Sequence, residues 1–107
     1  MSFMNYKDDA TLDKLVDSSN YRDRERAANQ GYALDILVGD RYRCVRKAVA
    51  KHGRPQDLDI LVYDKTWYVR SKVAESGQKK YIDILLENED NAARIAAICK
   101  ICKERGK

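Results

Sequence analysis

The chain has 107 residues, of which 44% are hydrophobic and 36% charged, and its formal net charge is +4. This length suits one domain, because two domains of about 50 residues each would be too small to bury a stable core. The composition fits a soluble globular protein and excludes an intrinsically disordered chain. We therefore expect residues 1–107 to form a single domain, with residues 1–11 as an N-terminal cap or tail.

Neither a membrane span nor a secretory signal is visible. The longest apolar runs, 60–63 and 95–99, are far shorter than the ~20 residues that a membrane-spanning helix needs. No basic stretch followed by an apolar one opens the chain, as it would in a signal peptide. Cysteines are too few and odd in number for a disulfide framework; they are Cys44, Cys99 and Cys102. We expect a cytoplasmic location and no membrane partner.

The main signal in the sequence is an internal repeat. The segment LDILV at 34–38 returns at 58–62, and IDILL follows at 82–86, so that both steps are 24 residues long. A degraded first copy, LDKLV at 12–16, lies 22 residues before its successor. Such self-similarity at a fixed period is the signature of a repeat architecture. The resulting units are 12–33, 34–57, 58–81 and 82–107.

Each unit is predicted to contain two short helices. The first carries the L-D-x-L-V motif, whose apolar spacing suits a buried helix, and we expect Ile36, Ile60 and Ile84 in its core column. The second is amphipathic, with Val49 and Val73 on its buried face. It ends at a glycine, which adopts the left-handed conformation easily. These glycines are Gly31, Gly53 and Gly77.

The remaining elements complete the fold prediction. Pro55 has no amide hydrogen to lose and should begin the first helix of the third unit. Tyr63 and Tyr81 are expected to be core aromatics. No segment alternates with period two, so we expect no sheet. The predicted fold is all-α: a right-handed α-solenoid, or α–α superhelix, of about four two-helix repeats of ~24 residues.

The second helices also carry a family resemblance. The pattern D-x-x-x-x-V-R-x-x-V-A-x-x-G, at 40–53 and 64–77, resembles HEAT-type repeats. The short period is more similar to the leucine-rich variant repeat, in which an α-helix alternates with a shorter, often 3₁₀, helix. The resemblance covers about 12–101 and implies the solenoid architecture, not a particular activity. No cysteine-rich cluster precedes the repeats, so it implies no iron–sulfur site and no other cofactor.

Two charged columns run through the repeats. The acidic column could offer a stripe to a basic partner, but acids in the first turn of a helix more often complement its dipole or pair with a neighbouring base. It comprises Asp13, Asp35, Asp59 and Asp83. The arginine column begins at Arg24, and its offset of six residues from Asp40 and Asp64 predicts a structural Asp–Arg ladder between units. The ladder residues are Asp40, Asp64, Arg46, Arg70 and Arg94. Its two acids should also cap the helices that follow them.

A basic stretch is less easily explained by architecture. Six basic residues and no acid lie within 41–54: Arg41, Arg43, Arg46, Lys47, Lys51 and Arg54. The stretch is either a patch for phosphate or an acidic protein surface, or a solvated helix face, and the sequence leaves both open. Trp67 and Tyr68 lie in the columns of Arg43 and Cys44, so we expect Trp67 outside the valine core.

These features favour a non-enzymatic module that binds a protein partner through one face, the alternative being a nucleic-acid backbone gripped by the basic patch. Cys99 and Cys102 form C-x-x-C on a predicted helix, which we interpret as packing rather than a metal or redox site. We expect no catalytic residue, metal or cofactor, and the oligomeric state stays open. The candidate binding residues are Arg41, Tyr42, Arg43, Lys47, Lys51, Arg54, Trp67 and Tyr68.

Overall fold

The computed structural model describes residues 9–87 and 93–98, and within these ranges every regular element is a helix. The helices are α1 (Asp9–Asp17), α2 (Tyr21–Asn29), α3 (Leu34–Leu37), α4 (Arg43–Lys51), α5 (Pro55–Leu61), α6 (Trp67–Glu75) and α7 (Lys79–Leu86). Residues 93–98 are also helical. The prediction of an all-α chain without a sheet is confirmed for this described part. No helix in it is long and apolar enough to cross a membrane.

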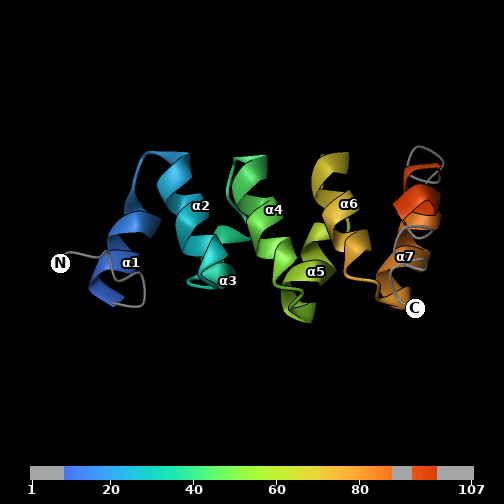
Figure 1. Ribbon diagram of the computed structural model, residues 1–107, viewed down its shortest axis with the longest axis horizontal. Helices are drawn as coiled ribbons and strands as arrows, with labels where there is room; N and C mark the ends of the chain where they lie inside the picture. The colour runs from blue at the N-terminus through green and yellow to red at the C-terminus, as the bar shows by residue number, and fades with distance from the viewer. Residues whose placement is uncertain (1–8, 88–92, 99–107) are drawn as a thin grey trace.

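The helices lie in two rows (Figure 1). Helices α2, α4 and α6 stand side by side in chain order, and α2 contacts α4 as α4 contacts α6. The short helices α3 and α5 form the other row, with α1 and α7 near the two ends. Each short helix packs against the long helix before it and the long helix after it. The start of every long helix is thereby presented along the same side of the molecule.

The core lies between the two rows. Val45, Val49, Val69 and Val73 are fully buried, as predicted for Val49 and Val73. The short helices α3 and α5, together with α7, contribute leucines that are at most 4% exposed. Full burial of one such aliphatic side chain contributes about 1.5–3 kcal/mol. The leucines are Leu34, Leu37, Leu58, Leu61 and Leu85.

The isoleucine column does not belong to this core. Ile36 is 68% exposed and Ile60 is 56% exposed, which corrects the prediction, while Ile84 is partly buried against the core. The reason is helical geometry: Leu34, Leu37 and Val38 share one face at spacings of three and four, and the third residue of the motif points away from it. This leaves isoleucine side chains on the outer face of the short helices.

Tyr63 is a second correction. It lies beyond the end of α5, in the turn towards α6, and is 72% exposed, whereas Tyr81 is buried as predicted. Tyr63 follows the two buried residues that close the third L-D-x-L-V motif, so the chain has already left the core when it reaches this position.

The long helices end as predicted. Gly31, Gly53 and Gly77 have φ values of +76°, +69° and +74°. After α2, the N–H of Gly31 donates to the carbonyl of Ala28 at 2.9 Å, and the N–H of Tyr32 to that of Ala27 at 3.0 Å. This pair of bonds is the Schellman arrangement, which satisfies carbonyls that the helix leaves open. Pro55 is the first residue of α5, also as predicted.

Candidate functional site

A ladder of arginine–aspartate contacts joins neighbouring units. Nε of Arg24 lies 2.6 Å from Oδ2 of Asp40, and Nε of Arg46 lies 2.6 Å from Oδ2 of Asp64. All four side chains are at most 11% exposed. Hydrogen bonding to the Asp40 carboxylate raises the pKa of Arg24. Within one unit, the arginine and the aspartate six residues before it are joined through the backbone and not through the carboxylate. Nη1 of Arg46 donates to the backbone carbonyl of Asp40, and Arg70 donates to that of Asp64.

The ladder acids are not the helix caps that the sequence suggested. The N-cap residues of α4 and α6 are Tyr42 and Thr66, and neither makes a side-chain capping bond. Oδ1 of Asp40 instead accepts the N–H of Tyr42 at 2.9 Å, and Oδ1 of Asp64 accepts that of Thr66 at 2.8 Å. The carboxylates therefore fix the turn before each helix while they hold an arginine of the preceding unit.

The acidic column, which runs through α1, α3, α5 and α7, forms a second set of contacts. Asp13 accepts from Tyr32, and Asp59 accepts from Lys80 at 3.0 Å and from Tyr81 at 2.8 Å. The Tyr81 hydroxyl and then the Lys80 ammonium lower the pKa of Asp59, and burial followed by the Asp59 bond raises the pKa of Tyr81. Asp83 pairs within α7 with Lys79 at 2.8 Å.

Arg54 belongs to these contacts and stands apart from the other candidate binding residues. Its Nε lies 2.7 Å from Oδ2 of Asp57, whose side chain is 2% exposed, and its Nη2 lies 2.7 Å from Oδ1 of Asp35. The bonds to Asp57 and Asp35 raise the pKa of Arg54. Two of the six cations in 41–54 are thus paired, because Arg46 is the ladder residue. The other four are Arg41, Arg43, Lys47 and Lys51.

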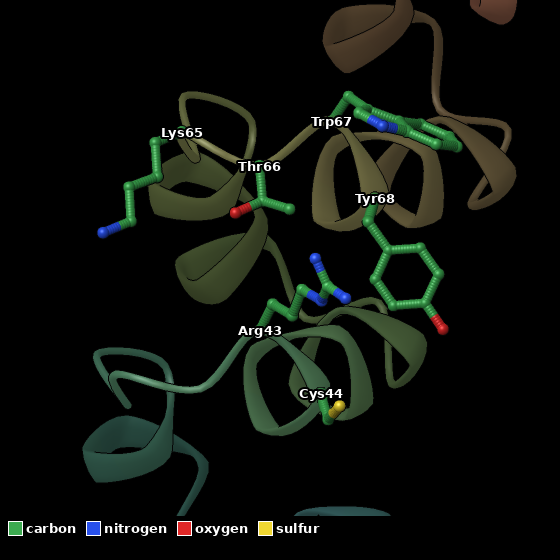
Figure 2. Close-up of a pocket in the computed structure, with 6 residues that line it drawn as sticks. All are labelled: Arg43, Cys44, Lys65, Thr66, Trp67 and Tyr68. Carbon is green, nitrogen blue, oxygen red and sulfur yellow. The ribbon is translucent and has the colours of Figure 1, made fainter.

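Residues at the start of α4 and α6 form an open depression of about 450 Å³, lined by Arg43, Cys44, Lys65, Thr66, Trp67 and Tyr68. In Figure 2 the Arg43 guanidinium extends from α4 towards the start of α6, beside the Tyr68 ring. Its Cζ is 5.7 Å from the centre of that ring. From the next turn of α4, Nζ of Lys47 donates to the Tyr68 hydroxyl at 2.6 Å. We call Arg43, Lys47, Lys65, Trp67 and Tyr68 the α4–α6 surface.

Trp67 is held on this surface from two sides. Its ring meets Tyr68 edge-on, with centroids 6.3 Å apart, and Cζ of Arg94 lies 4.1 Å from its centre. Arg94, which the sequence places in the arginine column, thus stacks on an aromatic ring. Trp67 nevertheless stays 46% exposed, which confirms that it lies outside the valine core. A large ring is therefore ordered and still open to a partner.

Tyr42 contacts α2 instead of this surface. Its ring stacks on Tyr21 with centroids 4.6 Å apart and planes 8° from parallel, and Arg24 and Arg41 each lie 5.5 Å from its centre. The sequence reasoning overlooked Tyr21. Its position as the first residue of α2, in the column that Arg43 and Trp67 occupy in later units, was the signal that could have revealed it.

The described residues hold no cluster of metal-ligating side chains. No group of three or more His, Cys, Asp or Glu in 9–87 and 93–98 could hold a metal ion. Cys44 is a half-buried free thiol, and Cys99 and Cys102 lie outside the described ranges.

Comparison of the chain with protein-family models, with curated proteins and with solved structures found no match. Function is therefore inferred from the α4–α6 surface itself.

Proposed function

We propose that the chain is a single-domain, right-handed α-solenoid whose four units display a binding surface. Three features support this architecture: the sequence repeat, the side-by-side order of α2, α4 and α6, and contacts that join each unit to the next. In such a protein a unit buries its apolar face only against its neighbours. The likeness to HEAT-type and leucine-rich variant repeats is part of the same proposal.

On this basis the protein is a non-enzymatic module, and the α4–α6 surface binds an acidic segment of a partner protein. The observation that carries this function is the exposed pair Trp67 and Tyr68, surrounded by the cations Arg43, Lys47 and Arg94. Tryptophan, tyrosine and arginine dominate the residues that carry binding energy at protein interfaces. The local excess of positive charge selects an acidic partner.

The arrangement of the rings favours tight binding. Trp67 is positioned by Tyr68 and Arg94, and Tyr68 by Lys47, before any partner arrives. Immobilising a free side chain at an interface costs roughly 0.5–1.5 kcal/mol, and a ring already held in place avoids part of that loss. The surface therefore resembles a preorganised anchor more than a collection of solvated charges.

Binding to a nucleic-acid backbone is the alternative that the remaining cations keep open. Four exposed or half-exposed cations on or before α4 could each neutralise one phosphate: Arg41, Arg43, Lys47 and Lys51. With four contacts, affinity for duplex DNA would fall on the order of a hundredfold between roughly 50 and 200 mM salt. The pairing of Arg46 and Arg54 with carboxylates reduces the charge available for this purpose.

The test is selection from an unbiased displayed peptide library, followed by affinity measurements. We expect acidic peptides whose affinity falls about thirtyfold in Trp67→Ala, because a truncated aromatic anchor loses ~2 kcal/mol. Tyr63→Ala is the control, since it removes an aromatic side chain that is even more exposed than Trp67 and lies outside the α4–α6 surface. Binding of a 20-base-pair duplex that is salt-sensitive and survives Trp67→Ala would instead assign the surface to nucleic acid.

A further inference from the structure

A second depression lies beside the first. About 420 Å³ in volume, it is lined by Tyr21, Arg22, Glu25, Arg26, Asn29 and Cys44. Cys44 of α4 borders both depressions, so one lies between α2 and α4 and the other between α4 and α6. Each contains the aromatic first residue of a long helix, Tyr21 in one and Trp67 in the other.

The charges of the two depressions are alike in sign. Arg43 and Lys65 give the α4–α6 depression two positive charges and no acid. Arg22 and Arg26 give the lining of the α2–α4 depression two positive charges against one negative charge from Glu25, and Arg26 also pairs with Asp23, outside the lining, at 3.2 Å. A ligand that spans both therefore needs two separated anionic groups, joined by a chain that passes over Cys44.

The spacing of the helices restricts the conformation of that chain. Packed helices lie about 8–10 Å apart, and this is the step from one depression to the next. A polyproline II segment rises ~3.1 Å per residue with three residues per turn, so residues i and i+3 point the same way about 9 Å apart. A β-strand places i and i+2 on one face at about 7 Å and i and i+4 at about 13 Å, and neither distance fits.

The rings that line the two depressions favour the same conformation. Aromatic-lined grooves bind polyproline II segments because these are extended before they bind and pack flat faces against the rings. Tyr21 supplies a half-exposed ring to the α2–α4 depression, and Trp67 and Tyr68 supply two rings to the α4–α6 depression. An α-helix with acids at i and i+7 has a suitable rise of ~10.5 Å, but its diameter of about 10–12 Å is wide for two shallow depressions.

We propose that α2, α4 and α6 together bind an acidic, proline-containing segment in the polyproline II conformation, with carboxylates at i and i+3 in neighbouring depressions. This inference rests on the proposed function and narrows it to a partner class. The carboxylate at one end meets Arg43 and Lys65, and that at the other meets Arg22 and Arg26. Glu25 opposes the second carboxylate and limits the affinity.

The test uses two labelled peptides of identical composition, Pro-Glu-Pro-Pro-Glu-Pro and Pro-Glu-Pro-Glu-Pro-Pro, each extended by two prolines at both ends. The first places its glutamates at i and i+3, and the second places them at i and i+2. We expect the first to bind the full-length protein about tenfold more tightly. Arg22→Ala and Arg43→Ala should each reduce this preference, since each removes one of the two cations that meet a carboxylate.

Two further variants separate charge placement from misfolding. Glu25→Gln should tighten binding of the i, i+3 peptide about threefold, a gain that a damaged fold cannot produce. Lys51→Ala removes a cation from α4 that lines neither depression and should leave the preference unchanged. If the two peptides bound with equal affinity and Trp67→Ala abolished the binding of both, this inference would be overturned and the proposed function would stand. Failure of both peptides and of all library-selected acidic peptides would overturn both, and tight binding of a Glu i, i+7 helical peptide would replace polyproline II by a helix.

Discussion

Arg46 and Asp64 form an ion pair at 2.6 Å although they belong to different units, and their side chains are only 8% and 6% exposed. The same guanidinium donates to the backbone carbonyl of Asp40 in its own unit at 2.6 Å. One side chain therefore joins the turn before α4 to the turn before α6. These two turns set where Arg43 and Trp67 begin their helices, so the ladder positions the candidate site.

Breaking this pair on one side should be strongly destabilising. Asp64→Ala leaves the Arg46 guanidinium buried without its carboxylate, and removing one partner of a buried pair costs about 3–5 kcal/mol. Urea unfolding followed by circular dichroism measures the loss. Arg26→Ala breaks the exposed pair with Asp23 and should change stability by less than about 1 kcal/mol. An Asp64→Ala protein as stable as wild type would show that the ladder contributes nothing.

Substitution by aspartate distinguishes the buried face of a helix from its exposed face. Val73 is fully buried in α6, so Val73→Asp places an uncompensated charge in the core and should unfold the chain. Ile60→Asp makes a comparable change at a side chain that is 56% exposed, and should shift the unfolding free energy by no more than about 0.5 kcal/mol. In thermal melts, Ile60→Asp should unfold near the wild-type melting temperature and Val73→Asp should show no folded state. Similar melting temperatures for the two variants would mean that the assignment of buried and exposed helix faces is wrong.

Glycine substitutions should separate backbone conformation from steric space. A Cβ at Gly53 or Gly77 would meet nothing within 4 Å, yet both have positive φ, and an alanine there costs roughly 1–2 kcal/mol. At Gly39 a Cβ would meet only the Ile36 carbonyl oxygen, at an ordinary contact distance of 4.0 Å, and φ is not positive, so Gly39→Ala should be neutral or stabilise by about 0.4–1 kcal/mol. Equilibrium unfolding of the three variants gives the comparison, and equal effects at Gly39 and Gly53 would contradict it.

The contact between Asp59 and Tyr81 predicts a pH dependence. The Tyr81 hydroxyl and the Lys80 ammonium lower the pKa of Asp59, because they stabilise the ionised carboxylate in the folded state and not in the unfolded state. The resulting stability is present above the unfolded pKa of about 3.9 and is lost as pH falls through the lower folded value. Asp59→Asn should therefore lose less stability than wild type between neutral and acid pH.

The Tyr81→Phe variant checks the cause. It keeps the buried ring and removes the hydroxyl donor, so the pKa of Asp59 should rise towards its ordinary value in a carbon-detected NMR titration. An Asp59 pKa unchanged by Tyr81→Phe would show that the hydroxyl has no influence on it.

The repeat made much of the fold predictable. Columns such as Val49 and Val73, and the glycines that follow each long helix, recur at a fixed step, so each is supported by several copies. The position of Ile36 and Ile60 was not predictable in the same way, because a run as apolar as L-D-I-L-V fits more than one helix facing. Only the packing of α3 and α5 against α4 and α6 selects the leucines.

The site was predictable in part. The exposure of Trp67 follows from its column, where neighbouring units have polar residues. Whether a cation is free or paired depends on residues distant in sequence: Arg54 meets Asp35 across 19 positions, and Arg94 meets Trp67 from another helix. The stack of Tyr21 on Tyr42 joins a degraded first unit to the second, and its weak match to the repeat hid it.

Because each ladder contact joins a unit to the next one, the chain can gain a unit by duplication. An inserted second copy of 34–57 would bring its own Asp40 carboxylate for the arginine before it and its own Arg46 for the acid after it. Both new junctions would be chemically complete without any compensating substitution. Duplication of a single unit would thus produce a longer protein in one step, with a second copy of Arg43 and Lys47 and therefore a longer row of cations.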